Sequence, residues 1–382
     1  MTKKWCNAGT SHIWLRHDRK ITPCCALGEP MEFNLDKDGD FLKKMQSSEF
    51  IKAIEPLANG PLPKGRCDQC LSQDSATTTE NKRSRSVRHK INHFSNPVIG
   101  AHGKQNNNPF FLKIDFSNKC NLKCVMCNSK RSTGWVKDEQ KLSELGMFPK
   151  KAISSYDKLP DKWWLRNSKQ WWESVTKVEI SGGEPFYEPM LFEFLEFLLS
   201  IGRSSINLSI ITNLTLYNKN IDTILRKFKN VDLLCSVDAW EQDVYQYSRG
   251  GIYTLETIKE NIKQLSKVAS RLSIVDTIHC TTYDQSKLAK KWIKEQNLDN
   301  VYHNVNYVYT PRHLDVRSVL PDSMLETNKD IKIPQSGFKK EKQLQHKFYN
   351  WINALDKVRN TNILNIRPEF ESWFKEIETW AK

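Results

Sequence analysis

The chain has 382 residues, of which 38% are hydrophobic, and it carries a formal net charge of +14. This length can bury a large core and allows two or three units of typical domain size. No apolar run approaches the roughly 18 residues that a membrane span needs, and the first residues lack the apolar stretch of a signal peptide, so we expect a soluble cytoplasmic protein with no membrane partner.

The basic excess gives a sequence pI near 9.2, which keeps nucleic acid or an acidic substrate among the expected partners because positive charge attracts phosphates. The densest basic run covers Lys82–Lys90 and lies close to a pair of cysteines. A solvated, lysine-rich surface is the simpler explanation of the same charge. Composition alone therefore leaves the partner open.

Short elements are expected before residue 110. Strand-like runs cover His12–Arg16 and Lys20–Pro23, with the turn former Asp18 between them. A helical stretch follows over Phe41–Ile54. This part of the chain predicts a small, turn-rich region.

From residue 110 onward, strand and helix patterns alternate. Apolar runs rich in Ile, Val, Leu and Phe predict strands at Phe110–Phe116, Lys177–Ser181, Ile206–Thr212, Val231–Val237, Arg271–Cys280 and Val301–Tyr309. Helical periodicity separates them over Pro189–Ile201, Ile221–Phe228, Leu255–Val268 and Gln285–Gln296. Strands that alternate with helices in this way predict an α/β fold with a parallel sheet and right-handed crossovers.

Aromatic residues stand out in further segments. Trp163-Trp164 and Trp171-Trp172 flank two cations, so stacking of nucleic-acid bases is one interpretation. A helix with inward-facing aromatic side chains is the simpler one. After residue 321, helical patterns over Glu341–Val358 and Pro368–Trp380 carry aromatic stripes that we expect to pack against the α/β part of the chain.

Seven of the ten cysteines fall in clusters or metal-like spacings, which is typical of metal binding in a reducing compartment. Cys120, Cys124 and Cys127 directly follow the first strand of the alternating region. Thiolates are the ligands of iron–sulfur clusters, and ordinary electron carriers supply four of them. A set of three leaves one iron open for chemistry. Ordinary reduced thiols or a structural zinc site are the alternatives.

Small and polar residues follow the next three strands. The segment Ser181–Pro185 reads Ser-Gly-Gly-Glu-Pro, in which the glycines let the backbone approach a ligand and Pro185 rigidifies the exit. Polar candidates at or after the following strand ends are Thr212, Asn213, Ser236, Asp238 and Arg249. A strand-end cap or a loop hydrogen bond is the alternative for each of these polar residues.

Together, the cysteine spacing and the Gly-Gly-Glu-Pro motif one βα unit later resemble the signature of the radical S-adenosylmethionine (SAM) superfamily. The resemblance implies a partial (β/α)6 barrel whose site lies at the carboxyl ends of the strands. It also implies that Cys120, Cys124 and Cys127 hold a SAM-binding [4Fe–4S] cluster. The residues that it implies as SAM contacts are Met126, Gly182, Gly183, Glu184, Thr212, Asn213, Ser236, Asp238 and Arg249.

Several of these contacts have roles within the resemblance. The glycine backbone and the Glu184 carboxylate match the site of the SAM amino group. Thr212 and Asn213 match residues that hold ribose hydroxyls or the methionine carboxylate, and Arg249 is a candidate partner for a carboxylate. Met126 stands where the family often has an aromatic residue near the adenine, and its apolar, polarisable side chain is a reasonable substitute.

The N-terminal cysteines form a second set. The order of Cys6, Cys24-Cys25, and Cys67 and Cys70 resembles the SPASM/twitch module, although that module usually follows the barrel and here would precede it. The resemblance implies an auxiliary [4Fe–4S] cluster held by Cys6, Cys24, Cys67 and Cys70, with Cys25 possible in place of Cys24. A tetrahedral zinc site with four cysteine ligands has compatible spacing and remains an alternative.

These observations predict four parts of the chain. Residues 1–92 would be the twitch/SPASM-like module, and residues 93–109, which include the polar run Gln105–Pro109, a linker. Residues 110–320 would be the radical SAM barrel, and residues 321–382 a C-terminal helical extension. The predicted fold class is therefore α/β, with a partial barrel between a small cysteine-rich module and C-terminal helices.

The resemblance implies a radical SAM enzyme with an external electron donor. Its reduced cluster would cleave SAM to methionine and a 5′-deoxyadenosyl radical, which abstracts hydrogen from the substrate. An auxiliary cluster is typical of enzymes that modify peptides or proteins, so a peptide or protein leads the expected substrates. The alternatives are a radical SAM enzyme that modifies a nucleic acid or nucleotide, and a non-catalytic, metal-stabilised nucleic-acid-binding protein.

Overall fold

The computed structural model describes residues 6–24, 27, 31–35, 40–60, 62–63, 67, 70, 91, 111–149, 153–308, 310–326 and 340–380. Cys25, the basic run Lys82–Lys90 and the predicted linker 93–109 lie outside the described residues. The chain divides into two compact units. Unit 1 comprises Met1–Asn118, Asp157–Ile210 and Thr223–Val231, and unit 2 comprises Lys119–Tyr156, Ile211–Asp222 and Asp232–Lys382.

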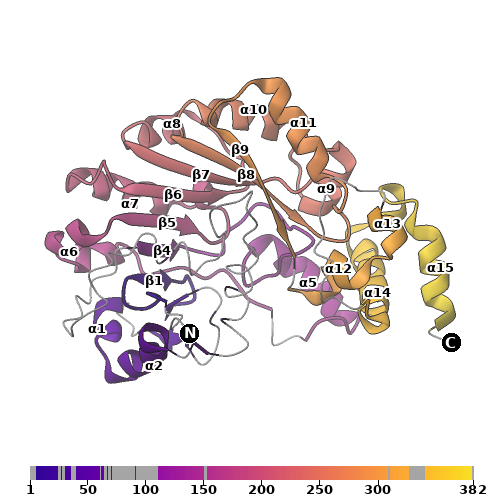
Figure 1. Cartoon of the computed structure of the whole chain (residues 1–382), viewed down its shortest axis with the longest axis horizontal. Coiled ribbons are helices and arrows are strands. Elements are labelled where there is room, and N and C mark those ends of the chain that lie inside the picture. Colours follow the sequence, from indigo (N-terminus) through magenta and orange to yellow (C-terminus); the bar gives the residue numbers. More distant parts are fainter. Residues whose placement is uncertain are drawn as a thin grey trace. The chain divides into compact units, whose positions relative to one another are not determined.

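The strands of unit 1 follow the order β3-β2-β1-β4-β5-β6, and Figure 1 labels β1, β4, β5 and β6. Their bounds are His12–Leu15 for β1, Lys20–Thr22 for β2, Phe33–Asn34 for β3, Phe111–Asp115 for β4, Lys177–Ser181 for β5 and Asn207–Thr212 for β6, of which the last two residues belong to unit 2. β1 pairs antiparallel with β2 but parallel with β4, where His12 lies opposite Phe111. The N-terminal strands therefore extend the same sheet as β4. The predicted domain boundaries stay a prediction.

The predicted single helix Phe41–Ile54 is two helices, α1 at Phe41–Met45 and α2 at Ser48–Asn59. The break has a local cause, because the Ser47 hydroxyl accepts a hydrogen bond from the Phe50 amide and so begins a new helix. Among the residues of unit 1 that the structure describes, the remaining helical segments are the 3-10 turns η4 at Trp163–Arg166 and η5 at Pro185–Tyr187, α6 at Lys169–Ser174 and α7 at Pro189–Ser200. The helix α8, Lys219–Leu225, begins in unit 2 and ends in unit 1.

The four tryptophans of Trp163-Trp164 and Trp171-Trp172 are buried in unit 1, each no more than 4% exposed. Three of them lie around Phe194 of α7, whose ring centroid is 6.0 Å from that of Trp163, 5.4 Å from that of Trp164 and 5.5 Å from that of Trp172, and Trp171 packs against Trp172. Rings that are enclosed by other rings have no face left for a nucleotide base. The packing interpretation is confirmed, and the stacking interpretation is wrong.

The strands of unit 2 are β7, Asn230–Ser236, whose first two residues belong to unit 1, β8, Arg271–Ile278, and β9, Val301–Tyr307. All three pair in parallel, with Cys235 opposite Ile274 and Ile274 opposite His303. The main helices of unit 2 are α5 at Val136–Glu144, α9 at Gln242–Arg249, α10 at Leu255–Ser266, α11 at Ser286–Gln296, α12 at Val316–Val319, α13 at Asp322–Glu326, α14 at Lys342–Arg359 and α15 at Phe370–Trp380. Parallel strands that alternate with helices confirm the predicted α/β class.

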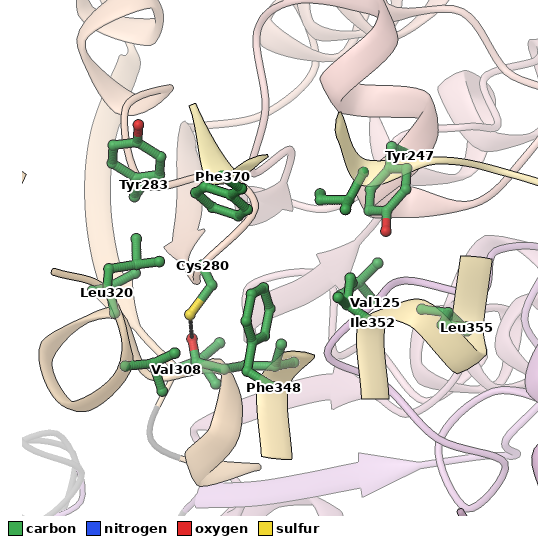
Figure 2. Close-up of a cluster of buried hydrophobic side chains, with 14 of the residues drawn as sticks. Val125, Tyr247, Cys280, Tyr283, Val308, Leu320, Phe348, Ile352, Leu355 and Phe370 are labelled. Atoms are coloured by element: carbon green, nitrogen blue, oxygen red, sulfur yellow. Dashed lines mark hydrogen bonds between the residues drawn. The ribbon is translucent and has the colours of Figure 1, made fainter. Parts of the chain in front are cut away.

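The core of unit 2 joins segments far apart in the sequence. Figure 2 shows Phe348, Ile352 and Leu355 of α14 beside Val125 and Tyr247, and all five side chains belong to one buried hydrophobic cluster. Burial of each large apolar side chain contributes roughly 1.5–3 kcal/mol. The aromatic stripes predicted for the C-terminal helices are therefore core residues, as expected.

None of the helices in the described parts of the chain is long and apolar enough to cross a membrane.

Candidate functional site

Three cysteines lie together in one loop of unit 2. Cys120, Cys124 and Cys127 are each partly exposed. Burial raises the pKa of the Cys127 thiol, and the neighbouring Cys124 and Cys120 thiols raise this pKa further. Cys120 and Cys124 thus lie within electrostatic reach of the Cys127 thiol in the same loop. Without a metal the Cys124 and Cys127 thiols stay protonated, because burial raises the pKa of each, and ligation would remove their protons.

The backbone of this cysteine loop is held by α9. The Lys123 amide donates to the Arg249 carbonyl at 3.2 Å, and the Val125 amide donates to the Ser248 carbonyl at 2.8 Å. The indole Nε1 of Trp135 donates to the Cys124 carbonyl at 2.8 Å. Polar backbone groups of the loop are thereby satisfied by fixed partners, which positions the thiols before any ligand binds.

Asn213 contacts the same loop. Its amide nitrogen lies 3.8 Å from the Cys120 sulfur and donates to the Asn121 side-chain oxygen at 2.9 Å. The Asn121 nitrogen in turn donates to the Thr215 hydroxyl at 2.8 Å. Thr212 is buried and accepts from the Leu214 amide. The structure therefore places Asn213 at the cysteine loop, and contact of Thr212 and Asn213 with SAM stays a prediction.

Asp238 and Arg249 form a buried ion pair of 2.5 Å. Burial raises the pKa of the Asp238 carboxyl, and Arg249 and the Thr277 amide oppose that shift. Burial alone would lower the pKa of Arg249, but the Cys124 thiol, Asp238 and Tyr245 raise it, so the guanidinium stays charged. Asp238 also adopts a left-handed backbone, with φ +70. Arg249, predicted as a carboxylate partner for SAM, has a carboxylate partner within its own unit.

Ser236 and Met126 also lie in unit 2. Ser236 is the last residue of β7 and is partly exposed. Met126 is partly buried and packs against the hydrophobic cluster of Figure 2. Both positions stay predictions as SAM contacts.

The Gly-Gly-Glu-Pro motif lies in unit 1, directly after β5. Gly182 has φ +120, and a Cβ there would lie 2.6 Å from the Ser117 carbonyl oxygen, so only glycine fits. The Gly183 amide donates to the same oxygen at 2.9 Å. The buried Glu184 carboxylate accepts from the Phe186 amide at 3.0 Å and begins η5. The motif is thus a fixed turn joined to the chain that follows β4.

A comparison with known families decides the identity of this part of the chain. Residues 114–289 match the family model of the radical SAM superfamily, a range that includes the cysteine loop and the Gly-Gly-Glu-Pro motif. Residues 114–289 therefore belong to the radical SAM superfamily. The predicted family is therefore confirmed.

Curated relatives of this radical SAM chain include two GTP 3′,8-cyclases. The Campylobacter lari protein is 28% identical over 137 residues, which are 35% of this chain and 36% of that protein. The Aliarcobacter butzleri protein is 26% identical over 167 residues, which are 43% of this chain and 45% of that protein. The chain thus spans less than half the length of these relatives.

Among solved structures, Streptococcus suis SuiB bound to its precursor peptide SuiA has a TM-score of 0.40 and 17% identity, and the match covers 94% of this chain and 73% of that chain. A second, anSMEcpe with bound AdoMet, has a TM-score of 0.40 and 18% identity over 66% and 63% of the two chains.

The predicted auxiliary cysteines of this radical SAM chain all lie in unit 1. Cys6, Cys24 and Cys70 are buried, and Cys67 is partly exposed. The Cys6 amide donates to the Leu57 carbonyl of α2 at 2.8 Å. Among the described residues, with Cys120, Cys124 and Cys127 included, no group of three or more His, Cys, Asp or Glu side chains is arranged to hold a single metal ion. The auxiliary cluster stays a prediction.

Two glycines outside the predicted site leave room for the backbone of the cysteine loop. A Cβ at Gly134 would lie 2.6 Å from the Leu122 carbonyl oxygen, and one at Gly250, with φ +62, would lie 2.8 Å from the Lys123 carbonyl oxygen. The glycine pair Gly250–Gly251 near the end of a helical pattern was a readable signal. The spacing of the cysteines alone gave no reason to connect these glycines with the loop.

The buried pair Asp238–Arg249 yields a stability prediction. Asp238→Asn tolerates the left-handed backbone but removes the charge opposite a buried guanidinium, so we expect the free energy of unfolding to fall by about 3–5 kcal/mol. Urea denaturation of the metal-free protein measures this loss. The double variant Asp238→Asn with Arg249→Met is the control and should lose less than the single variant. Equal stability of wild type and Asp238→Asn would contradict the assignment of a charged pair.

Proposed function

We propose that this radical SAM chain is an enzyme that reductively cleaves SAM and abstracts hydrogen from a substrate. The presence of Cys120, Cys124 and Cys127 in one loop whose backbone is held by α9 and Trp135 supports the proposal most directly. Three thiols suit three irons of a cubane cluster and leave the fourth iron for SAM. The chemistry of the donor set therefore fits a [4Fe–4S] cluster.

A cluster and SAM, when bound, would supply one-electron cleavage of the sulfonium to methionine and a 5′-deoxyadenosyl radical, with the electron from an external donor. The chain holds the three thiolates through the backbone contacts of the loop. Buried Val125 and Trp135 keep water from the loop backbone. In unit 1, the rigid Gly-Gly turn and the Glu184 carboxylate would receive the SAM amino group.

Asp238 and Arg249 have a further role in this proposal. Because they pair with each other and Arg249 offers its carbonyl to Lys123, they fix the end of α9 beneath the cysteine loop. We assign them first to positioning the loop. Ser236, Thr212 and Asn213 remain the proposed polar contacts for SAM.

Replacing Cys120, Cys124 and Cys127 with Ala should abolish formation of 5′-deoxyadenosine by the reduced, anaerobically reconstituted protein, because no thiolate then holds the cluster. Liquid chromatography of the reaction mixture measures the product. Cys280→Ala is the matched control, since Cys280 is buried in the core of unit 2 and donates to the Leu314 carbonyl. Undiminished turnover by the triple variant would refute the function.

An auxiliary [4Fe–4S] cluster on Cys6, Cys24, Cys67 and Cys70 is also proposed. Burial of three of these cysteines within one unit supports it, as does the thiol-only donor set. Such a cluster would take back an electron from the product radical or bind substrate.

Two cubanes predict roughly eight irons per chain after reconstitution. Cys67→Ala with Cys70→Ala should lower the iron content to about half, because one cluster loses two ligands, while 5′-deoxyadenosine is still formed. Elemental analysis distinguishes the outcomes. Zinc at this site would remove the proposed electron-transfer role, and an unchanged iron content would show that these cysteines hold no cluster.

A peptide or protein is the proposed substrate class, on the strength of the cysteine-rich module. A nucleotide is the second candidate, because the curated relatives are named GTP 3′,8-cyclases and the chain carries a charge of +14.

The two classes predict different reactions. With a substrate present, SAM cleavage should accelerate above the rate without substrate, because bound substrate consumes the radical. Parallel assays with a peptide library and with the four ribonucleoside triphosphates, read out as 5′-deoxyadenosine, separate them. Acceleration by peptides alone supports the first class, and acceleration by a nucleotide alone would replace it with the second.

A further inference from the structure

Arg359 is the last residue of α14, yet its side chain reaches the cysteine loop within unit 2. The guanidinium Nη2 donates to the Lys123 carbonyl at 2.6 Å, across 236 residues of sequence. Its Nε donates to the Asp138 carboxylate of α5 at 2.7 Å. Only 5% of the side chain is exposed. A C-terminal arginine is thus buried against the residue that precedes Cys124.

Trp135 completes this contact. The Arg359 guanidinium lies 4.6 Å from the centroid of the Trp135 ring, a distance at which the cation and the ring attract each other. The Trp135 indole donates to the Cys124 carbonyl. Arg359 therefore supports the loop twice, directly at Lys123 and through Trp135 at Cys124.

Gly250 lies next to the guanidinium of Arg359. A Cβ at Gly250 would lie 3.3 Å from Nη1 of Arg359, so glycine at this position leaves room for the arginine. Nη1 is buried and has no hydrogen-bond partner among the residues that the structure describes. A buried, unpaired donor of a cation is costly unless negative charge lies near it.

Two arginines lie against the backbone of the cysteine loop. The Arg249 carbonyl accepts from the Lys123 amide, and the Arg359 guanidinium donates to the Lys123 carbonyl. Arg249 is neutralised by Asp238, whereas Asp138 is shared between Arg359 and Lys123, which lies 3.3 Å from it. One carboxylate facing two cations leaves an excess positive charge beside the loop.

We propose that Arg359 is a positioning residue of the cluster site: it fixes the cysteine loop to the C-terminal helix α14, and its positive charge favours the reduced, more negative state of the cluster. The inference rests on the proposed function, because it assumes that the three cysteines hold a cluster. It makes the C-terminal helices part of the redox site.

The test compares the full-length wild type with Arg359→Gln and Arg359→Lys after anaerobic reconstitution with iron and sulfide, each carrying Cys67→Ala and Cys70→Ala so that one cluster is observed. Iron per chain is measured first. A redox titration followed by electron paramagnetic resonance then gives the midpoint potential. Arg317→Gln is the matched control, because Arg317 also pairs with a carboxylate, Asp315, and lies 5.4 Å from an aromatic ring, that of Tyr307.

Arg359→Gln should lower the equilibrium constant for reduction about tenfold, a shift of about 59 mV to more negative potential for one electron. Arg359→Lys keeps the charge but not the planar fork, so its potential should stay closer to wild type while its iron content falls. Arg317→Gln should change neither quantity.

An unchanged potential and iron content in Arg359→Gln would overturn the inference, as would an equal shift in Arg317→Gln. If Arg359→Gln does not fold, Arg359→Lys decides through its iron content. Failure of the wild type itself to bind iron would instead refute the proposed function, so the two failures are distinguishable.

Discussion

The hydrogen bond from the Val125 amide to the Ser248 carbonyl of α9 is the contact on which the site depends. Val125 stands between Cys124 and Cys127, and its side chain belongs to the hydrophobic cluster that contains Ile352 and Leu355 of α14. One residue thus joins the cysteine loop to the core of unit 2. Because the core is closely packed and resists change in volume, it also restricts movement of the loop.

Rigidity of this kind suits a site that must bring three thiols to one ligand. A flexible loop would lose conformational entropy each time it closed around a cluster. Here much of that cost is met during folding, by the contacts of Lys123 and Val125 with α9 and of Cys124 with Trp135. The glycines at 134 and 250 serve the same arrangement, since a side chain at either position would separate the loop from its supports.

Buried charges around the loop are arranged in pairs. Asp238 faces Arg249, and Asp138 faces Arg359. A buried ion pair contributes little net stability, but it is strongly destabilising to break, so it fixes one arrangement among several. The pairs therefore hold the cations beside Cys124 rather than let them move to solvent. This is a reason for a radical SAM chain to keep charged residues in its interior.

The sequence by itself determined the elements whose signals are local. Continuous apolar runs predicted the bounds of β5, Lys177–Ser181, without error. They predicted the ends of the other parallel strands to within two residues, because a strand buried on both faces needs a continuous apolar run. The cysteine spacing and the Gly-Gly-Glu-Pro turn were also readable, since each depends on a few adjacent residues. Cap residues could have located the break at Ser47, which the helical pattern concealed.

Only the tertiary structure decided what depends on distant parts of the chain. It joined β1 to β4, packed three tryptophans around Phe194, and paired Arg249 with Asp238. It brought Arg359 to Asp138 across 221 residues. No periodicity or spacing encodes such contacts, because they arise when separate helices and strands pack their buried faces together. The residues that would supply the chemistry can be read from local motifs, whereas the positions of the charged residues around them depend on the fold.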